Sequence, residues 1–303
     1  MESWTDAYSG DISFLRCERA EEPTGVDISV IGIPYDMGTT GRPGARFGPR
    51  AVREQSLAVG EFPWGVWPWD HDVRDRHSIR DLGDVMGFTA YPDRLCPTVE
   101  ARADQILEAG SSLFSIGGDH FVSFPLLRAH VRKHGPVALI HFDAHSDTWV
   151  DNDLNHGTMF WHAIKEGLID TERSVHIGLR TPNPDSHGIL NLNANICLTT
   201  PAEQIAEQVR KRVGNAAAYL TFDIDFLDPA FAPATGTPVT GGPDVGYARR
   251  VLHGLKGLNI VGGDQVEVSP HYEGPGQITA LAGATVAADI VYLIGLAREA
   301  RFK

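Results

Sequence analysis

The sequence predicts an α/β protein with a mainly parallel sheet. Short apolar runs alternate along the chain with segments of helical spacing, as in sheets whose parallel strands are connected by helices. No linker, repeat, low-complexity stretch or shift in composition divides the 303 residues, so we expect one domain, 1-303, with residues 1-25 as a polar surface arm. Eight alternating units would also fit a closed barrel, and the alternation alone leaves that alternative open.

The individual elements follow from local patterns. The run from Ile28 to Ile33 is continuously apolar and predicts a buried strand, and Pro49 suits the first turn of a following helix. Between them lies a long loop rich in Gly and Pro, of a kind that is usually functional. Further strands are expected at 79–85, 113–116, 137–142, 174–179, 195–198, 218–223 and 258–264, and further helices at 98–109, 123–133, 158–165, 201–213, 244–256 and 278–300.

Composition narrows the class of partner. The net charge of −13 argues against nucleic acid or an anionic membrane and suits metal ions or a cationic substrate. The three cysteines are odd in number and far apart, which indicates a reducing compartment without a disulfide framework. The amino terminus lacks the pattern of a signal peptide, and no apolar run approaches about 18 residues, so we expect a cytoplasmic protein. Residues 62–69 carry three of the six tryptophans, either as a subunit contact or as a wall of a site entrance.

Acidic and imidazole side chains gather where the expected strands end. Residues two apart on a strand point to the same side, and the carboxyl ends of parallel strands lie along one edge of the sheet. Charged groups crowded there are costly unless something neutralises them. We therefore expect metal ions among six residues that end strands or directly follow them: His120, Asp143, His145, Asp147, Asp223 and Asp225.

The donor set favours two divalent ions. Four carboxylates match the charge of two such ions, and hard oxygen donors without thiolates suit Mn²⁺ better than a structural zinc site. Two metals about 3.5–4 Å apart can share one water and lower its pKa, which provides a nucleophile without Ser or Cys. His141 lies on the same face but deeper in its strand, and we interpret it as a hydrogen-bonded core histidine.

With these motifs the chain resembles the ureohydrolases, the arginase/agmatinase superfamily. The resemblance extends from about Ile31 to Ala297 and rests on the motifs at 42–49, 62–64, 117–120, 142–147, 156–160, 222–238 and 267–270. It implies an arginase-like three-layer α/β/α domain with a mainly parallel sheet instead of a barrel. It also implies a dinuclear manganese centre, with nickel in some members, and a homo-oligomer that is a hexamer or a trimer.

The resemblance further implies roles for single residues. The family's metal ligands fall on the six positions named above, with Asp143 and Asp223 as bridging residues. Glu267 matches the acidic residue that holds the substrate guanidinium, for which a carboxylate is well shaped. His156 matches a histidine that shuttles a proton or orients the substrate, as a group that titrates near neutrality can. The implied reaction converts agmatine and water to putrescine and urea, a step of polyamine biosynthesis, with a proton supplied through His156 or Asp147.

Departures from the family motifs leave the substrate open. Ala234 stands where the family usually has Gly, and the turn at 242–246 is also unusual. Gln265 replaces an aliphatic residue, and strand alternation would place it on the same side as Glu267, in the floor of the substrate pocket. The alternatives to agmatine are therefore guanidinobutyrate, guanidine, an N-alkylguanidine or a biguanide.

The expected rim of the pocket bears on the same choice. Acidic residues in the loop 149–155 favour a substrate with a cationic tail, and Asn183 and Ser186 are further rim candidates. Two alternatives from other classes are a deacetylase-like metal hydrolase and an inactive partner subunit. The first would have fewer carboxylates around one metal, and the second would have lost ligands, whereas all six ligand positions are occupied here.

Overall fold

In the part of the chain that the structure describes, eight strands form a single open sheet, which excludes the barrel. This computed structural model describes residues 11–61, 67–88 and 91–301. The strand order is β2-β1-β3-β8-β7-β4-β5-β6, and every neighbouring pair is parallel. The strands are β1 (Ile28–Ile33), β2 (Ile79–Asp84), β3 (Ser112–Gly117), β4 (Ala138–Phe142), β5 (Val175–Ile177), β6 (Leu190–Leu192), β7 (Ala218–Asp223) and β8 (Ile260–Val266).

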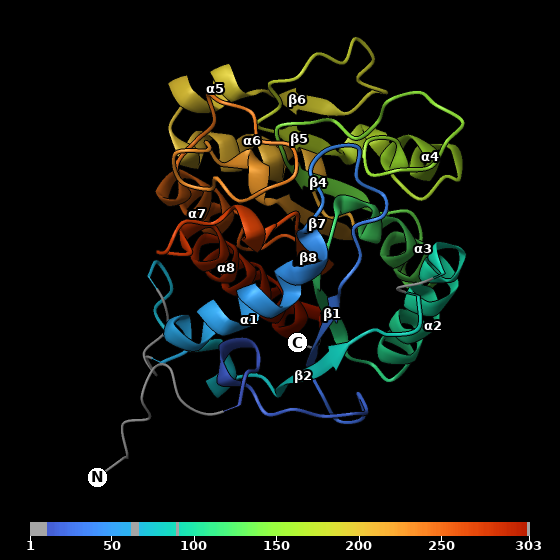
Figure 1. Ribbon diagram of the computed structural model, residues 1–303. Helices are drawn as coiled ribbons and strands as arrows, with labels where there is room; N and C mark the ends of the chain where they lie inside the picture. Colours follow the sequence, from blue (N-terminus) through green and yellow to red (C-terminus); the bar gives the residue numbers. More distant parts are fainter. Residues whose placement is uncertain (1–10, 62–66, 89–90, 302–303) are drawn as a thin grey trace.

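Helices cover both faces of the sheet, which confirms the three-layer α/β/α architecture (Figure 1). One face carries α2 (Leu95–Glu108), α3 (Ser123–His134) and α4 (Met159–Lys165). The other carries α1 (Gly48–Val59), α5 (Ala194–Thr199), α6 (Ala202–Val213), α7 (Val245–Gly254) and α8 (Ile278–Arg301). The inner strands are fully buried on both faces, which explains why they are continuous apolar runs in the sequence.

Helix α8 corrects one expectation from the sequence. It is 24 residues long and apolar enough, by length and composition, to cross a membrane, although no apolar run of that length was expected. However, 83% of its most apolar window is buried inside the protein. It packs against β8 and against the neighbouring helices α1 and α7. The helix is apolar all round because it is a core helix.

Two further segments differ from the expectations. Residues 195–198 were predicted as a strand but lie in α5, because the side chain of Asn193 accepts a hydrogen bond from Ile196 N and caps a helix there. The strand of this region is β6, a short edge strand. In the expected surface arm, Phe14 and Leu15 are buried in the core, while residues 1–10 lie outside the described residues.

The Trp-rich segment is described only in part, since residues 62–66 lie outside the described residues. Trp69 is buried, stacks on Tyr292 and donates a hydrogen bond to Asp289. Trp67 is exposed. The choice between a subunit contact and an entrance wall therefore stays open for this segment.

Candidate active site

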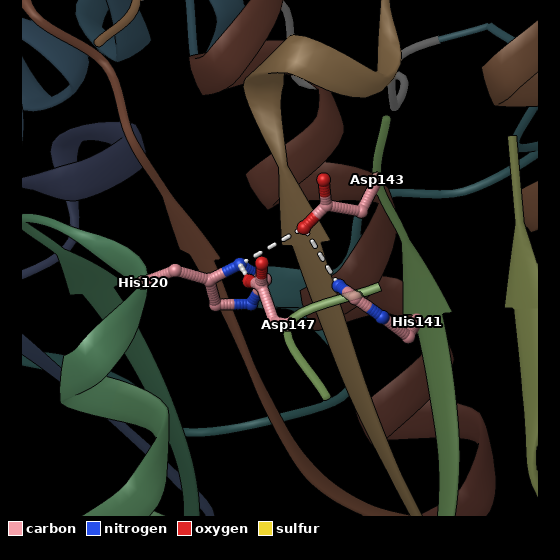
Figure 2. A group of neighbouring side chains, drawn as sticks. All are labelled: His120, His141, Asp143 and Asp147. Carbon is pink, nitrogen blue, oxygen red and sulfur yellow. Dashed lines mark hydrogen bonds and ion pairs between the residues drawn. The ribbon is translucent and has the colours of Figure 1, made fainter. Parts of the chain in front are cut away.

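The first half of the site surrounds the imidazole of His120. This residue follows β3, and its Nδ1 lies 3.1 Å from Asp143 Oδ2, 3.0 Å from Asp147 Oδ2 and 3.3 Å from Asp223 Oδ2. Figure 2 shows His120 and the carboxylates of Asp143 and Asp147 pointing toward one another from different parts of the chain. All four residues are buried. Three carboxylates around one nitrogen form a pocket of oxygen and nitrogen ligands.

The second half surrounds His145. Its Nδ1 lies 3.0 Å from Asp225 Oδ2 and 3.3 Å from Asp143 Oδ1. Asp143 thus directs one oxygen to His120 and the other to His145, so it is the residue that joins the two halves. The strands explain the convergence, because β4 and β7 are neighbours and both end at this edge of the sheet. All six predicted ligand residues are therefore brought together.

Local turns hold the carboxylates in place. Asp143 Oδ1 accepts a hydrogen bond from His145 N at 2.5 Å, and Asp223 Oδ1 accepts one from Asp225 N at 2.7 Å. In both Asp-x-His and Asp-x-Asp the first side chain bonds the backbone two residues on, a conformation that Asp favours. Asp147 has a φ of 52°, in the left-handed region where non-Gly residues are uncommon. The two-residue spacing of these side chains therefore also allows the hydrogen bond that forms the turn after each strand.

Neighbouring carboxylates raise the pKa values of Asp223 and Asp225. Burial raises the pKa of Asp223 well above its usual range, and the charges of Asp225 and Asp143 raise it further. Burial and the charge of Asp143 likewise raise the pKa of Asp225. Burial would also raise the pKa of Asp143, but the neighbouring imidazoles, His141 first among them, hold it well below its usual range. The cluster holds more negative charge than it neutralises by itself.

The imidazoles show the opposite effect, and together with the carboxylates they fit divalent cations. Burial alone would lower the pKa of His120, but polar contacts with its three carboxylates raise it well above its usual range. For His145 the neighbouring carboxylates outweigh burial and raise the pKa to about 12. His120 Nδ1 is buried and, in the described part of the chain, has no partner of hydrogen-bonding geometry. An unpartnered ring nitrogen facing oxygen donors suits a metal ion.

His141, which lies in β4, contacts Asp143 of the cluster. Its Nε2 lies 2.7 Å from Asp143 Oδ2 and its Nδ1 lies 2.8 Å from His176 Nδ1 (Figure 2 shows the first contact). Both ring nitrogens are thus engaged in a fully buried side chain. This confirms the prediction of a hydrogen-bonded core histidine.

A second pair, Glu267 and His156, lies next to the cluster. Glu267 Oε1 is 3.0 Å from His156 Nδ1 and accepts a hydrogen bond from His120 N at 2.9 Å. On the other side of the ring, His156 Nε2 is 2.7 Å from Thr40 Oγ1 and accepts from Thr40 N at 2.9 Å. Burial would lower the pKa of His156, but Glu267 outweighs burial and raises it to about 9. Glu267 adopts a φ of 67°, an unusual backbone for a non-Gly residue and one that is often found at functional sites.

A cleft of about 310 Å³ is lined by members of both groups, although Glu267 is not among its described lining residues. Trp149 and Asp151 lie in the exposed loop at its rim. The cleft is lined by Thr40, His145, Asp147, Trp149, Asp151, Asn155, His156, Gly157, Thr158, Asp223 and Thr237. It therefore joins the expected ligands with the expected proton-transfer residue, and it is large enough for a small molecule.

Two expected substrate residues lie elsewhere. Gln265 packs against Gly283 of α8 and donates to Val266 O. Strand alternation failed to place it because Glu267 leaves the extended conformation, so the two side chains do not share a face. The amide of Asn183 donates to Ser146 Oγ and Thr148 Oγ1. Among the described residues that line the cleft, neither Gln265 nor Asn183 is present.

Sequence reasoning did not single out Thr40 or Thr237, both of which line the cleft. Thr40 contacts His156 Nε2 through its backbone N and its hydroxyl, and Thr237 Oγ1 donates to Asp225 Oδ2 at 3.1 Å. A signal existed for each, since Thr40 lies in the Gly- and Pro-rich loop after β1 and Thr237 lies in the motif 222–238. A hydroxyl residue in a loop has no spacing pattern that would distinguish it further.

Comparisons with known proteins identify the family of this chain. Residues 26–292 match the arginase family. An agmatinase from Neisseria meningitidis is 45% identical over 96% of this chain and 95% of that protein. The crystal structure of a hypothetical agmatinase from Burkholderia thailandensis covers 98% of this chain and 94% of that chain, with 44% identity and a TM-score of 0.94. Proclavaminate amidino hydrolase from Streptomyces clavuligerus covers 97% of this chain and 100% of that chain, with 36% identity and a TM-score of 0.89. The chain belongs to the arginase family.

Proposed function

We propose that the protein is a metal-dependent ureohydrolase that hydrolyses agmatine to putrescine and urea. The observation that supports this proposal is a single cleft shared by the carboxylate–imidazole cluster and by His156, which is paired with Glu267. Full-length similarity to agmatinases, at 45% identity, supports the choice of substrate.

The cluster would hold two divalent cations, which we propose are Mn²⁺, with Ni²⁺ as the alternative. His120 with Asp147 would serve one cation and His145 with Asp225 the other, while Asp143 and Asp223 would serve both. Bound divalent cations lower the pKa of water and so supply a nucleophile at neutral pH. The protein's own part is to fix the positions of the reacting groups.

Glu267 would hold the guanidinium group. Its Oε1 is engaged by His120 N and His156, whereas its buried Oε2 has no hydrogen-bond partner in the described part of the chain. A buried carboxylate oxygen without a donor is costly, and a guanidinium N–H would satisfy it with a charge-assisted hydrogen bond. Gly236 leaves room there, because a Cβ at that position would lie 3.3 Å from Oε2.

His156 would carry the proton to the leaving amine. Thr40 N donates to Nε2, which requires a lone pair on that atom, so the neutral ring keeps its proton on Nδ1 against Glu267. Glu267 favours the charged ring and Thr40 favours the neutral one, so both forms have a partner. A group with a partner in each protonation state can accept and release a proton. Asp147, which lines the same cleft, is the alternative proton donor.

The rim supports a substrate with a cationic tail. Trp149 offers an aromatic face and Asp151 a carboxylate at the exposed side of the cleft. An ammonium group is attracted to both. The side chains of Asn183 and Gln265, which we considered for substrate contact, instead donate hydrogen bonds within the protein. Agmatine carries such an ammonium at the end opposite its guanidinium, whereas guanidinobutyrate carries a carboxylate.

A second candidate is another guanidino compound. The similarity to proclavaminate amidino hydrolase favours it. That protein is 36% identical to this chain with a TM-score of 0.89, and its name gives a substrate other than agmatine. The test is urea release by the Mn²⁺- and Ni²⁺-loaded protein with agmatine, guanidinobutyrate, guanidine, an N-alkylguanidine and a biguanide. We expect the highest kcat/KM with agmatine. A higher value for another compound would replace the substrate but keep the reaction, and no urea from any compound would refute both.

The remaining expectations are part of the same proposal. The protein would act in the cytoplasm as a homo-oligomer, a hexamer or a trimer, without nucleic acid or membrane partners. Light scattering of the purified protein measures the subunit number directly. A fully active monomer would contradict the proposal that the protein acts as a homo-oligomer.

A further inference from the structure

A row of buried polar side chains crosses the sheet just below the strand ends. Asp264 of β8 is in register with Thr221 of β7, Thr221 with His141 of β4, and His141 with His176 of β5. Residues in register on parallel neighbours point to the same face of the sheet. All four are at most 2% exposed. Such a row is costly inside a core unless its members are hydrogen-bonded in a defined way.

The Asp264 carboxylate accepts hydrogen bonds from three hydroxyl groups. Ser123 Oγ and Tyr219 OH donate to Oδ2 at 2.7 and 2.6 Å, and Thr221 Oγ1 donates to Oδ1 at 2.5 Å. An ionised carboxylate only accepts hydrogen bonds, so each hydroxyl must use its proton here. The single proton of Thr221 is therefore committed to Asp264.

This commitment determines what Thr221 offers to His120. Thr221 Oγ1 lies 2.8 Å from His120 Nε2, and only an oxygen lone pair remains available for that contact. Nε2 must then carry the proton of the neutral ring, which leaves the lone pair on Nδ1. That atom faces the carboxylates of Asp143, Asp147 and Asp223 at 3.0–3.3 Å.

We propose that Asp264, acting through Thr221, fixes the tautomer and orientation of His120 so that its Nδ1 is available to a divalent cation. Asp264 and Thr221 are positioning residues, because neither is among the described residues that line the cleft. The proposal rests on the metal centre of the proposed function. Outer contacts of this kind typically contribute 10–100-fold to metal affinity.

The test is Mn²⁺ binding by the metal-free protein, measured by titration calorimetry without substrate. Thr221→Val keeps the shape but removes the hydroxyl, and we expect one of two binding events to weaken by about 10–100-fold. Thr221→Ser restores the hydroxyl and should restore the affinity of the parent. Tyr219→Phe is the matched control, since it removes a different donor to Asp264 but leaves the Thr221 link, and it should bind as the parent does.

Three results would overturn the inference. They are parent-like binding by Thr221→Val, weak binding by Thr221→Ser, and weak binding by Tyr219→Phe equal to that of Thr221→Val. If Thr221→Val does not fold, Asp264→Asn provides the second variant. An amide N–H facing Thr221 would donate to its hydroxyl oxygen, so the hydroxyl proton of Thr221 could then point toward His120. Parent-like Mn²⁺ binding by Asp264→Asn would overturn the inference as well. A parent protein that binds no divalent ion would refute the proposed metal centre itself, whereas the other results leave that centre intact.

Discussion

The two sides of the cleft are built from different parts of the fold. On one side, Asp143 and Asp223 stand at the ends of central strands, and both are at most 3% exposed. On the other side, Trp149 and Asp151 lie in an exposed loop between β4 and α4. The buried side has several partners for each group, whereas Asp151, among the described residues, accepts a single hydrogen bond, from Asp153 N. We therefore propose that the reaction depends on the sheet edge and that the choice of substrate depends on the loop.

The buried side also contains the strained backbone. Asp147 and Glu267 have positive φ values, a conformation that costs free energy unless the surroundings enforce it. Neighbouring strands and the hydrogen bonds to His120 N and His156 provide that enforcement for Glu267. A rigid arrangement of this kind keeps reacting groups aligned, so small changes there are expected to have large effects.

The largest effect is expected for Asp143→Asn. This carboxylate is the one shared between His120 and His145, so its charge serves both halves of the cluster. We expect loss of bound metal and a fall in kcat/KM larger than the 10–100-fold typical of changes in the groups behind a metal's ligands. Metal content by elemental analysis and urea release measure the two effects.

The matched control for Asp143→Asn is Asp153→Asn, the same substitution in the exposed loop. It should retain the metal content and the activity of the parent protein. If Asp143→Asn kept two equivalents of metal and full activity, the sheet edge would not be the centre of the reaction.

Glu267→Gln separates the reaction from metal binding. The amide keeps an acceptor for His120 N and His156 but cannot form an ion pair with a guanidinium. We expect a decrease of about 10²–10³-fold in kcat/KM, comparable to the loss of one preorganised polar contact in an active site. Metal content should be unchanged.

The contrast between these two variants is the informative result. If Glu267→Gln lost metal together with activity, Glu267 would belong to the cluster and not to the substrate pocket. Steady-state kinetics and elemental analysis on the same samples distinguish the two outcomes.

Asp151→Asn tests the loop side. An exposed charge pair contributes about 0.2–1 kcal/mol, so KM for agmatine should rise by at most about fivefold while kcat is unchanged. The increase should diminish at high salt, because exposed charges are screened. Asp153→Asn, whose side chain is absent from the described lining of the cleft, should leave KM unchanged. Equal effects of the two variants would remove Asp151 from substrate recognition.

The sequence predicted the sheet-edge side well, for a physical reason. A buried parallel strand is a continuous apolar run, and its polar end is therefore visible in the sequence. The positions of Asp143, Asp223 and their neighbours two residues on follow from that pattern, and the structure brings them together. The register of the strands, which aligns Thr221 with Asp264, has no comparable local signal.

Side chains outside the six expected metal ligands were less predictable. Gln265 was expected in the pocket floor, but the positive φ of Glu267 breaks the alternation on which that expectation rested. Asn183 was expected at the rim, but it bonds to hydroxyl groups of Ser146 and Thr148. Such contacts join loops that are far apart in the sequence, and loop geometry is set by tertiary packing more than by periodicity.

The pH dependence of stability tests the point where the two sides meet. Burial lowers the pKa of His156, but Glu267 raises it to about 9, above the value of about 6.5 in an unfolded chain. A raised folded-state pKa means that protonation of His156 stabilises the fold fully below about pH 6.5 and that this contribution is lost as the pH rises through about 9. His156→Gln removes it, so the difference in Tm between the metal-free parent and this variant should narrow from pH 7 to pH 10. When both proteins also carry Glu267→Gln, the same Tm difference should narrow at a lower pH. A difference that stays constant would mean that the hydrogen bond from Thr40 N keeps the ring neutral. Glu267 would then accept a hydrogen bond from the Nδ1–H of an uncharged histidine.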